Sequence, residues 1–70
     1  MKLYGVCIGS YVSEDGFAFF TCNNKTEARK LGNQYRKAWE ITDPIVKIVE
    51  IPESIRDDNE ERRKYAVISA

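Results

Sequence analysis

The sequence predicts an α+β fold in which an antiparallel β-sheet of three or four strands carries one α-helix on one face. Three observations support it. Two short apolar segments flank a turn, a segment with helical periodicity follows, and a run dense in β-branched residues comes next. The order of elements is therefore β-β-α-β. A two-layer arrangement buries the apolar side of each element, and at 70 residues we expect one small domain spanning residues 1–70 with a thin core.

The first two predicted strands form a hairpin. In residues 3–12, apolar side chains recur at every second position, which is typical of a strand with one buried face. Residues 13–16 favour a turn and lead into a second strand over residues 17–22. With a four-residue loop, Cys7 would lie opposite Cys22, but other loop lengths shift this register.

A helix is predicted to begin after Asn24 and to end near residues 40–41. Asn24 can cap the first turn, and Glu27 can reach back to the Asn24 amide. Asp43 precedes Pro44 and is therefore biased away from the helical conformation. The side chains expected to pack on the sheet are Leu31, Tyr35, Ala38 and Trp39.

Residues 45–51 are rich in valine and isoleucine and predict a third strand, which Pro52 closes. Beyond it, residues 53–63 are either a charged loop or a short helix. Residues 64–69 resemble a fourth strand, and a frayed chain end is the alternative.

Three glycines are expected to mark close packing: Gly5, Gly9 and Gly32. Gly9 lies in the first strand, where an aromatic side chain such as Phe20 would cover it. Gly32 lies inside the helix, where glycine costs about 1 kcal/mol relative to alanine. We therefore expect the sheet to approach the helix closely at Gly32.

The composition argues against most enzyme classes. The chain has no histidine and two cysteines, Cys7 and Cys22, whose separation fits no zinc motif. A nucleophilic cysteine would have no histidine to serve as its base, so buried, inert thiols are the simpler interpretation. No glycine-rich phosphate-binding motif is present. We expect no catalytic residue, no metal and no cofactor.

The net charge is zero, with 11 basic and 11 acidic residues, so any electrostatic attraction to a partner must be local. The first residues predict a strand rather than a signal peptide, and no stretch reaches the length of a membrane span. We expect a cytoplasmic protein that does not bind membranes.

The predicted helix is basic. Five cations face two carboxylates, Glu27 and Glu40, for a net charge of +3. Such a surface can bind phosphate groups, although a solvated helix back is the simpler alternative. The candidate nucleic-acid or partner-binding residues are Lys25, Arg29, Lys30, Arg36 and Lys37.

Aromatic side chains of the hairpin give a second indication of nucleic-acid binding. Tyr11, Phe19 or Phe20, if displayed on an open sheet, would stack bases as RNA-binding sheets do. Core packing is the simpler explanation of the same residues.

Residues 53–61 are acidic, with five carboxylates against Arg56, for a net charge of −4. These carboxylates would either pair with the basic helix inside the molecule or recognise a basic protein surface. The candidate acidic partner-binding residues are Asp57, Asp58, Glu60 and Glu61.

The hypothesis that follows is a small noncatalytic binding module that acts through protein–protein contacts. Its partner would be a second copy of the chain or a larger protein, and an accessory role in a phage or mobile element fits this size. The alternative is a nucleic-acid-binding domain that uses the basic helix. The β-β-α-β layout is similar to double-stranded-RNA-binding-like folds and to small phage accessory proteins, but no motif selects among them.

Overall fold

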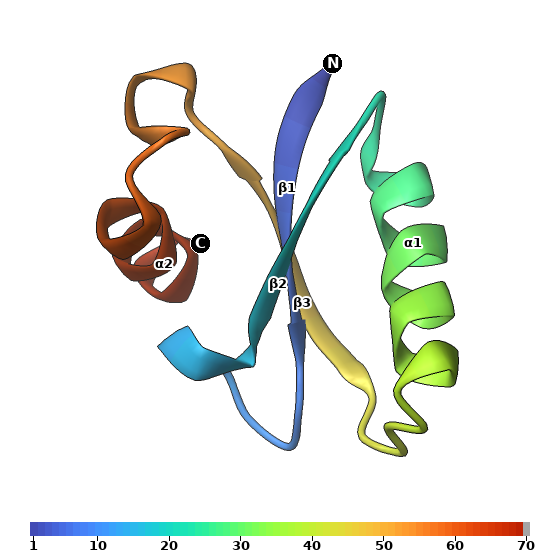
Figure 1. The fold of residues 1–70 in the computed structure, drawn as a ribbon. Helices are drawn as coiled ribbons and strands as arrows, with labels where there is room; N and C mark the ends of the chain where they lie inside the picture. The colour runs from blue at the N-terminus through green and yellow to red at the C-terminus, as the bar shows by residue number, and fades with distance from the viewer. Residues whose placement is uncertain (70) are drawn as a thin grey trace.

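The computed structural model describes residues 1–69 and shows a three-stranded antiparallel sheet between two helices (Figure 1). The strand order is β2-β1-β3. The helices and strands are β1 (Lys2–Ile8), β2 (Phe17–Cys22), α1 (Lys25–Ala38), β3 (Ile45–Ile51) and α2 (Asn59–Ile68). Two short 3-10 helices, η1 (Glu14–Gly16) and η2 (Glu53–Ile55), precede β2 and α2. The α+β class and the order β-β-α-β of the first four elements are confirmed.

The central strand β1 is buried on both faces. Val6 and Cys7 are neighbours in the chain, and both are 0% exposed. Val6 belongs to a core between the sheet and α1, which we call the α1-side cluster: Tyr4, Val6, Cys22, Ala28 and Ile48. Cys7 belongs to a core between the sheet and α2, the α2-side cluster: Leu3, Cys7, Phe17, Val49, Ile51 and Ala66. Each face of the sheet therefore has its own core.

The predicted fourth strand is wrong, because residues 59–68 form helix α2. Asp58 caps this helix, its side chain accepting a hydrogen bond from the Glu61 amide at 3.1 Å. Lys64 and Glu60, one turn apart, form an ion pair of 2.9 Å. Ala66 packs into the α2-side cluster and is fully buried. Residues 53–63 are expected from the sequence to form a charged loop or a short helix. The helix is observed in η2 and from Asn59 onwards, where α2 begins.

The hairpin loop is longer than the four residues considered from the sequence. Residues 9–16 connect the strands, so Cys7 pairs with Phe17, and Cys22 pairs with Lys2. The register in which Cys7 lies opposite Cys22 is therefore wrong. The observed register places Phe17 beside Cys7 in the α2-side cluster, where Phe17 is only 4% exposed.

Helix α1 begins with the predicted cap. The Asn24 side chain accepts a hydrogen bond from the Glu27 amide at 2.9 Å. The Glu27 carboxylate in turn accepts one from the Asn23 amide at 3.0 Å, one residue earlier than expected. The helix ends at Ala38, two residues before Glu40, which adopts a left-handed conformation with φ of 54°.

Small residues hold α1 against the sheet. Gly32 is buried over Val6, which confirms the close approach expected there. The expected contact at Gly9 is wrong: the register instead sets Phe19 opposite Gly5, and the Phe19 ring covers that glycine.

The predicted packing face of α1 is only partly correct. Leu31 packs against the α1-side cluster, but Ala28 and Gly32 are the helix residues that are fully buried. Ala38 is exposed, and Tyr35 and Trp39 are 37% and 69% exposed. Two small residues on the packing side let the helix approach the sheet, so the larger side chains near its end lie outside the core.

Neither helix within residues 1–69 combines the length and the apolar character that crossing a bilayer requires.

Candidate functional site

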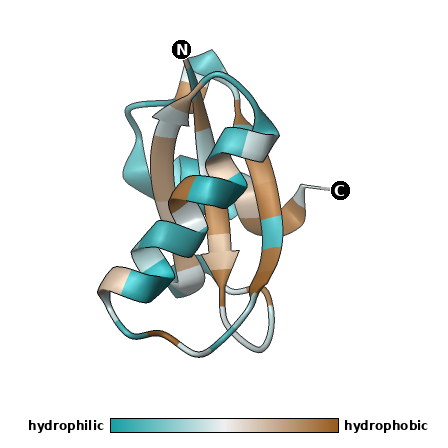
Figure 2. Cartoon of the chain, turned by 90° about the vertical axis from the view of Figure 1, so that its right-hand side faces the viewer, coloured by the Kyte–Doolittle hydropathy of each residue, from teal (hydrophilic) through white to brown (hydrophobic). Residues whose placement is uncertain are grey.

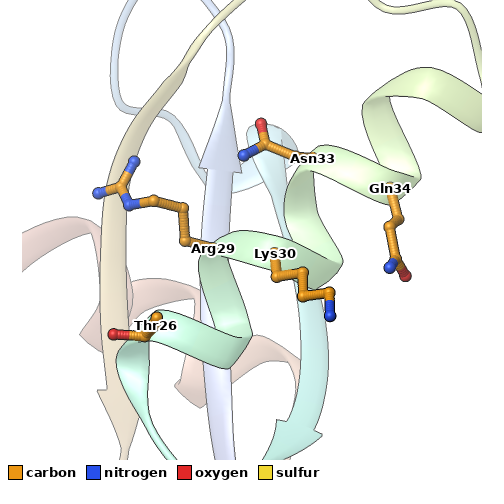
Figure 3. A pocket seen from close by; sticks show the side chains of 5 residues that line it. All are labelled: Thr26, Arg29, Lys30, Asn33 and Gln34. Atoms are coloured by element: carbon orange, nitrogen blue, oxygen red, sulfur yellow. The ribbon is translucent and has the colours of Figure 1, made fainter.

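The outward side of α1 is polar along its length. Because Ala28 and Gly32 face the sheet, the opposite side of the helix faces solvent, and Figure 2 shows it as mainly hydrophilic above hydrophobic strands. Five of its side chains line a shallow, open depression (Figure 3): Thr26, Arg29, Lys30, Asn33 and Gln34. Together with Lys25 and Lys37 at the two ends of the helix, we call this surface the basic face.

The cations of the basic face lack carboxylate partners. Within residues 1–69, the ion pairs shorter than 4.0 Å are Lys2–Glu50, Arg56–Glu53 and Lys64–Glu60. None of them involves α1. The nearby Glu27 carboxylate is engaged by the Asn23 amide at the start of the helix. Lys25, Arg29, Lys30 and Lys37 therefore form no ion pair with another side chain among the described residues.

Arg36 does not belong to this exposed set, although the sequence pattern placed it there. Its Nε donates to the Asp43 carbonyl at 2.7 Å, and its terminal nitrogens donate to Asn33 Oδ1 at 2.9 Å and to the Thr42 carbonyl at 3.4 Å. The side chain is half-buried. Arg36 therefore fixes the connection between α1 and β3.

The candidate acidic residues lie at the start of α2, on the other side of the sheet from α1 (Figure 1). The expectation that they pair with the basic helix inside the molecule is therefore wrong. Asp58 caps α2, and Glu60 binds Lys64. The hydrogen bond and the charge of Glu60 raise the pKa of Lys64 above its usual value of 10.5. Asp57 and Glu61 are exposed beside them.

Two arginines of α2 have a role that sequence reasoning missed. The guanidinium groups of Arg62 and Arg63 lie 4.4 and 5.1 Å from the centre of the Phe19 ring. Arg63 also donates to the Glu14 carbonyl at 2.8 Å and to the Phe17 carbonyl at 3.1 Å. These contacts hold α2 on the sheet, and they cover the face of Phe19.

The other hairpin aromatics are not displayed on an open sheet either. Phe20 packs edge to face against Tyr35 of α1, with ring centres 6.0 Å apart. Tyr11 is 74% exposed but lies in the loop before η1. The proposed stacking of bases on the sheet is therefore wrong, because a helix covers each face.

A groove lined by both apolar and polar surface lies between the hairpin loop and the end of α1. We call it the aromatic groove. Its apolar walls include Ile8, Ala18, Tyr35 and Ile41, and two acidic residues, Asp15 and Asp43, also line it. Trp39 does not line the groove, but its ring centre lies 6.2 Å from that of Tyr35, which does.

The two cysteines are in different cores. Cys7 is 0% exposed in the α2-side cluster, and Cys22 is 2% exposed in the α1-side cluster. The expected burial of both thiols is confirmed. Among residues 1–69, no group of three or more histidine, cysteine, aspartate or glutamate side chains is arranged to hold a metal ion.

No family model, characterised protein or solved structure matches this chain.

Two surfaces can therefore bind a partner. The basic face offers unpaired cations and two side-chain amides, which suit an anionic partner. The aromatic groove offers apolar and aromatic surface beside two carboxylates, which suits a protein with apolar and basic side chains.

Proposed function

We propose that the chain is a small noncatalytic binding module that acts through protein–protein contacts at the aromatic groove. The observation that carries this proposal is the exposure of Trp39, which is 69% accessible to solvent while its ring lies beside that of Tyr35. Tryptophan and tyrosine are enriched among the residues that dominate binding energies at protein interfaces. An exposed pair of them next to a groove is a typical contact surface.

The residues that line the groove indicate which side chains a partner would present. Ile8, Ala18 and Ile41 provide apolar contact, and Asp15 and Asp43 add negative charge. Neither aspartate forms an ion pair with another side chain in the described part of the chain. The partner therefore presents an apolar side chain next to a lysine or arginine, on a larger protein or on a second copy of this chain.

The test is recovery of the tagged protein from a lysate of its native host, with and without nuclease. Proteins that bind at the groove should be recovered with the wild type and lost with Trp39→Ala. Ile68→Ala is the matched control, because Ile68 is also exposed, at 81%, but lies on α2. If both variants retain the same partners, or if nuclease removes everything that is bound, the proposal is wrong. Sedimentation of the purified protein measures its oligomeric state and shows whether the partner is a second copy of this chain.

Nucleic-acid binding through α1 is a second candidate, and one observation favours it. The four exposed cations of the basic face have no carboxylate partner, and the acidic residues lie behind the sheet. Four cations of one helix, none of them in an ion pair among the described residues, would therefore be available to a phosphate backbone.

A further inference from the structure

We propose that the basic face binds double-stranded DNA, with α1 lying in the major groove. This inference rests on the second candidate function, binding of nucleic acid through α1. It adds that the nucleic acid is a DNA duplex and that α1 contacts it in the major groove.

Because helices cover both faces of the sheet, the sheet cannot bind a single nucleic-acid strand in the common way. Proteins that bind single strands on a sheet stack the bases on exposed aromatic rings. Here Arg62 and Arg63 cover Phe19, and Tyr35 packs against Phe20. The basic face itself carries no aromatic side chain. A surface with cations and amides but without stacking platforms suits a duplex, in which the bases remain stacked on one another.

The shape of α1 agrees with a duplex of B form. The helix has 14 residues and forms an outer layer of the molecule, with its polar side uncovered (Figures 1 and 2). At about 1.5 Å per residue it is long enough to contact both walls of a groove. The major groove of B-DNA is about 12 Å wide and admits an α-helix. The major groove of duplex RNA is too narrow for side chains to read.

The side chains are arranged as a groove-binding helix requires. Asn33 and Gln34 lie in the middle of the face, and amide side chains can bond the edge of adenine. The Asn33 oxygen already accepts a hydrogen bond from Arg36, so Gln34 is the amide with both groups free for a base. Arg29 and Lys30 lie one helical turn before the amides, and Lys25 and Lys37 lie towards the helix ends, where phosphates would pass.

The charges predict weak binding with a moderate dependence on salt. Four cations, Lys25, Arg29, Lys30 and Lys37, are available for phosphates, and each phosphate contact contributes about −0.9 to the slope of log K against log salt. We expect a slope of about −3.6 and a dissociation constant of about 10⁻⁶ to 10⁻⁴ M for DNA of random sequence.

The experiment measures fluorescence anisotropy of a labelled DNA duplex of about 20 base pairs, an RNA duplex of the same sequence and the single DNA strand, between about 50 and 200 mM salt. The DNA duplex should bind more tightly than the other two. The double variant Lys30→Gln/Lys37→Gln should bind the DNA duplex about tenfold more weakly. It should also reduce the magnitude of the salt slope by about 2. The matched control is Lys2→Gln/Lys64→Gln, which removes the same charge from β1 and α2 and should change neither quantity. Arg29→Gln is an independent single change on the same face and should reduce the magnitude of the slope by about 1.

The outcomes separate this inference from the candidate function beneath it. If the RNA duplex or the single strand binds as tightly as the DNA duplex, the groove geometry is wrong and nucleic-acid binding stands. If the two double variants weaken binding equally, the basic face is not the site and the inference is overturned. If no probe binds, both the inference and the nucleic-acid candidate fall. Binding at the aromatic groove is tested separately by Trp39→Ala.

Discussion

Gly32 of α1 lies so close to Val6 of β1 that a Cβ atom at position 32 would be 2.9 Å from Val6 Cγ1. Val6 is fully buried and β-branched, so it has little freedom to move away. The contact sets the distance between the helix and the central strand. The orientation of the basic face therefore depends on a glycine on the opposite side of the same helix.

Gly32→Ala should destabilise the protein, although alanine is the better helix former by about 1 kcal/mol. The added methyl group would overlap Val6 Cγ1, and Ile45 Cδ1 would also be only 3.0 Å away. We expect a net loss of about 1 kcal/mol in the free energy of unfolding, measured in urea. Gln34→Ala on the exposed side of α1 is the control and should change it by less than about 0.5 kcal/mol. A stabilised Gly32→Ala variant would contradict the packing described.

Glu40→Gly should stabilise the protein. Glu40 has φ of 54°, and it follows the last turn of α1, where the Ile41 amide bonds back to the Arg36 carbonyl at 2.8 Å. Glycine adopts this left-handed conformation without the steric cost of a Cβ atom. We expect a gain of about 0.5 to 1 kcal/mol in the free energy of unfolding. Glu40→Ala removes the same carboxylate but keeps the Cβ atom, so an equal gain in that variant would assign the effect to charge instead.

Arg36→Ala and Arg29→Ala should separate a structural arginine from an exposed one. Arg36 donates three hydrogen bonds, two of them to backbone carbonyls of Thr42 and Asp43. Its removal should cost about 1 to 2 kcal/mol in the free energy of unfolding, whereas Arg29→Ala should cost less than about 0.5 kcal/mol. Urea denaturation of the two variants measures this difference, and equal costs would show that Arg36 does not anchor the connection.

Cys7 and Cys22 should remain separate thiols under oxidising conditions. They lie on opposite faces of the sheet, so an intramolecular disulfide would require unfolding. Titration with a thiol reagent should show slow modification of both groups in the native protein and fast modification in denaturant. Mass spectrometry after mild oxidation of the folded monomer checks the bond directly, and a loss of two hydrogens without unfolding would refute the observed register.

Glu60→Gln should lower the pKa of Lys64. The carboxylate accepts a hydrogen bond from the Lys64 ammonium group and raises its pKa above 10.5. Because the pKa is raised in the folded state, the stabilising contribution is complete at neutral pH and is lost as the pH rises through the folded pKa. An NMR titration of the Lys64 side chain measures the shift. An unchanged pKa in Glu60→Gln would mean that the ion pair does not persist in solution.

Local signals in the sequence predicted the parts of the fold that depend on neighbouring residues. The alternation around Val6 and the Asn24 cap act over a few positions, so β1 and the start of α1 were predictable. The pairing of Cys7 with Phe17 was not, because the burial of Phe17 decides it across an eight-residue loop, residues 9–16. Residues 64–69 contain β-branched and aromatic side chains, and the packing of Ala66 on the sheet favours the helix there across a long sequence separation.

The candidate site was predictable to a similar extent. The charge of α1 is visible in the sequence, but Arg36 and Arg29 are indistinguishable in a helical pattern. Their difference arises from the carbonyls of Thr42 and Asp43, which the fold brings to Arg36. The exposure of Trp39 was missed because periodicity places it on the apolar side of the helix, and periodicity does not say where the buried stretch ends.

Side chains alone hold α2 on the sheet. Within residues 1–69, no hydrogen bond between two backbone groups joins this helix to a strand. Its anchors include Ala66, the stacked Arg62 and Arg63, and Lys47 of β3, which donates to the Val67 carbonyl at 3.2 Å. The helix can therefore separate as a cooperative unit while the strand ladder stays intact. The Cys7 sulfur lies in the α2-side cluster, 3.8 Å from the Tyr11 carbonyl of the hairpin loop, and Cys22 lies in the α1-side cluster. The labelling kinetics of one cysteine each would therefore follow the opening of the two faces of the sheet independently in the native chain.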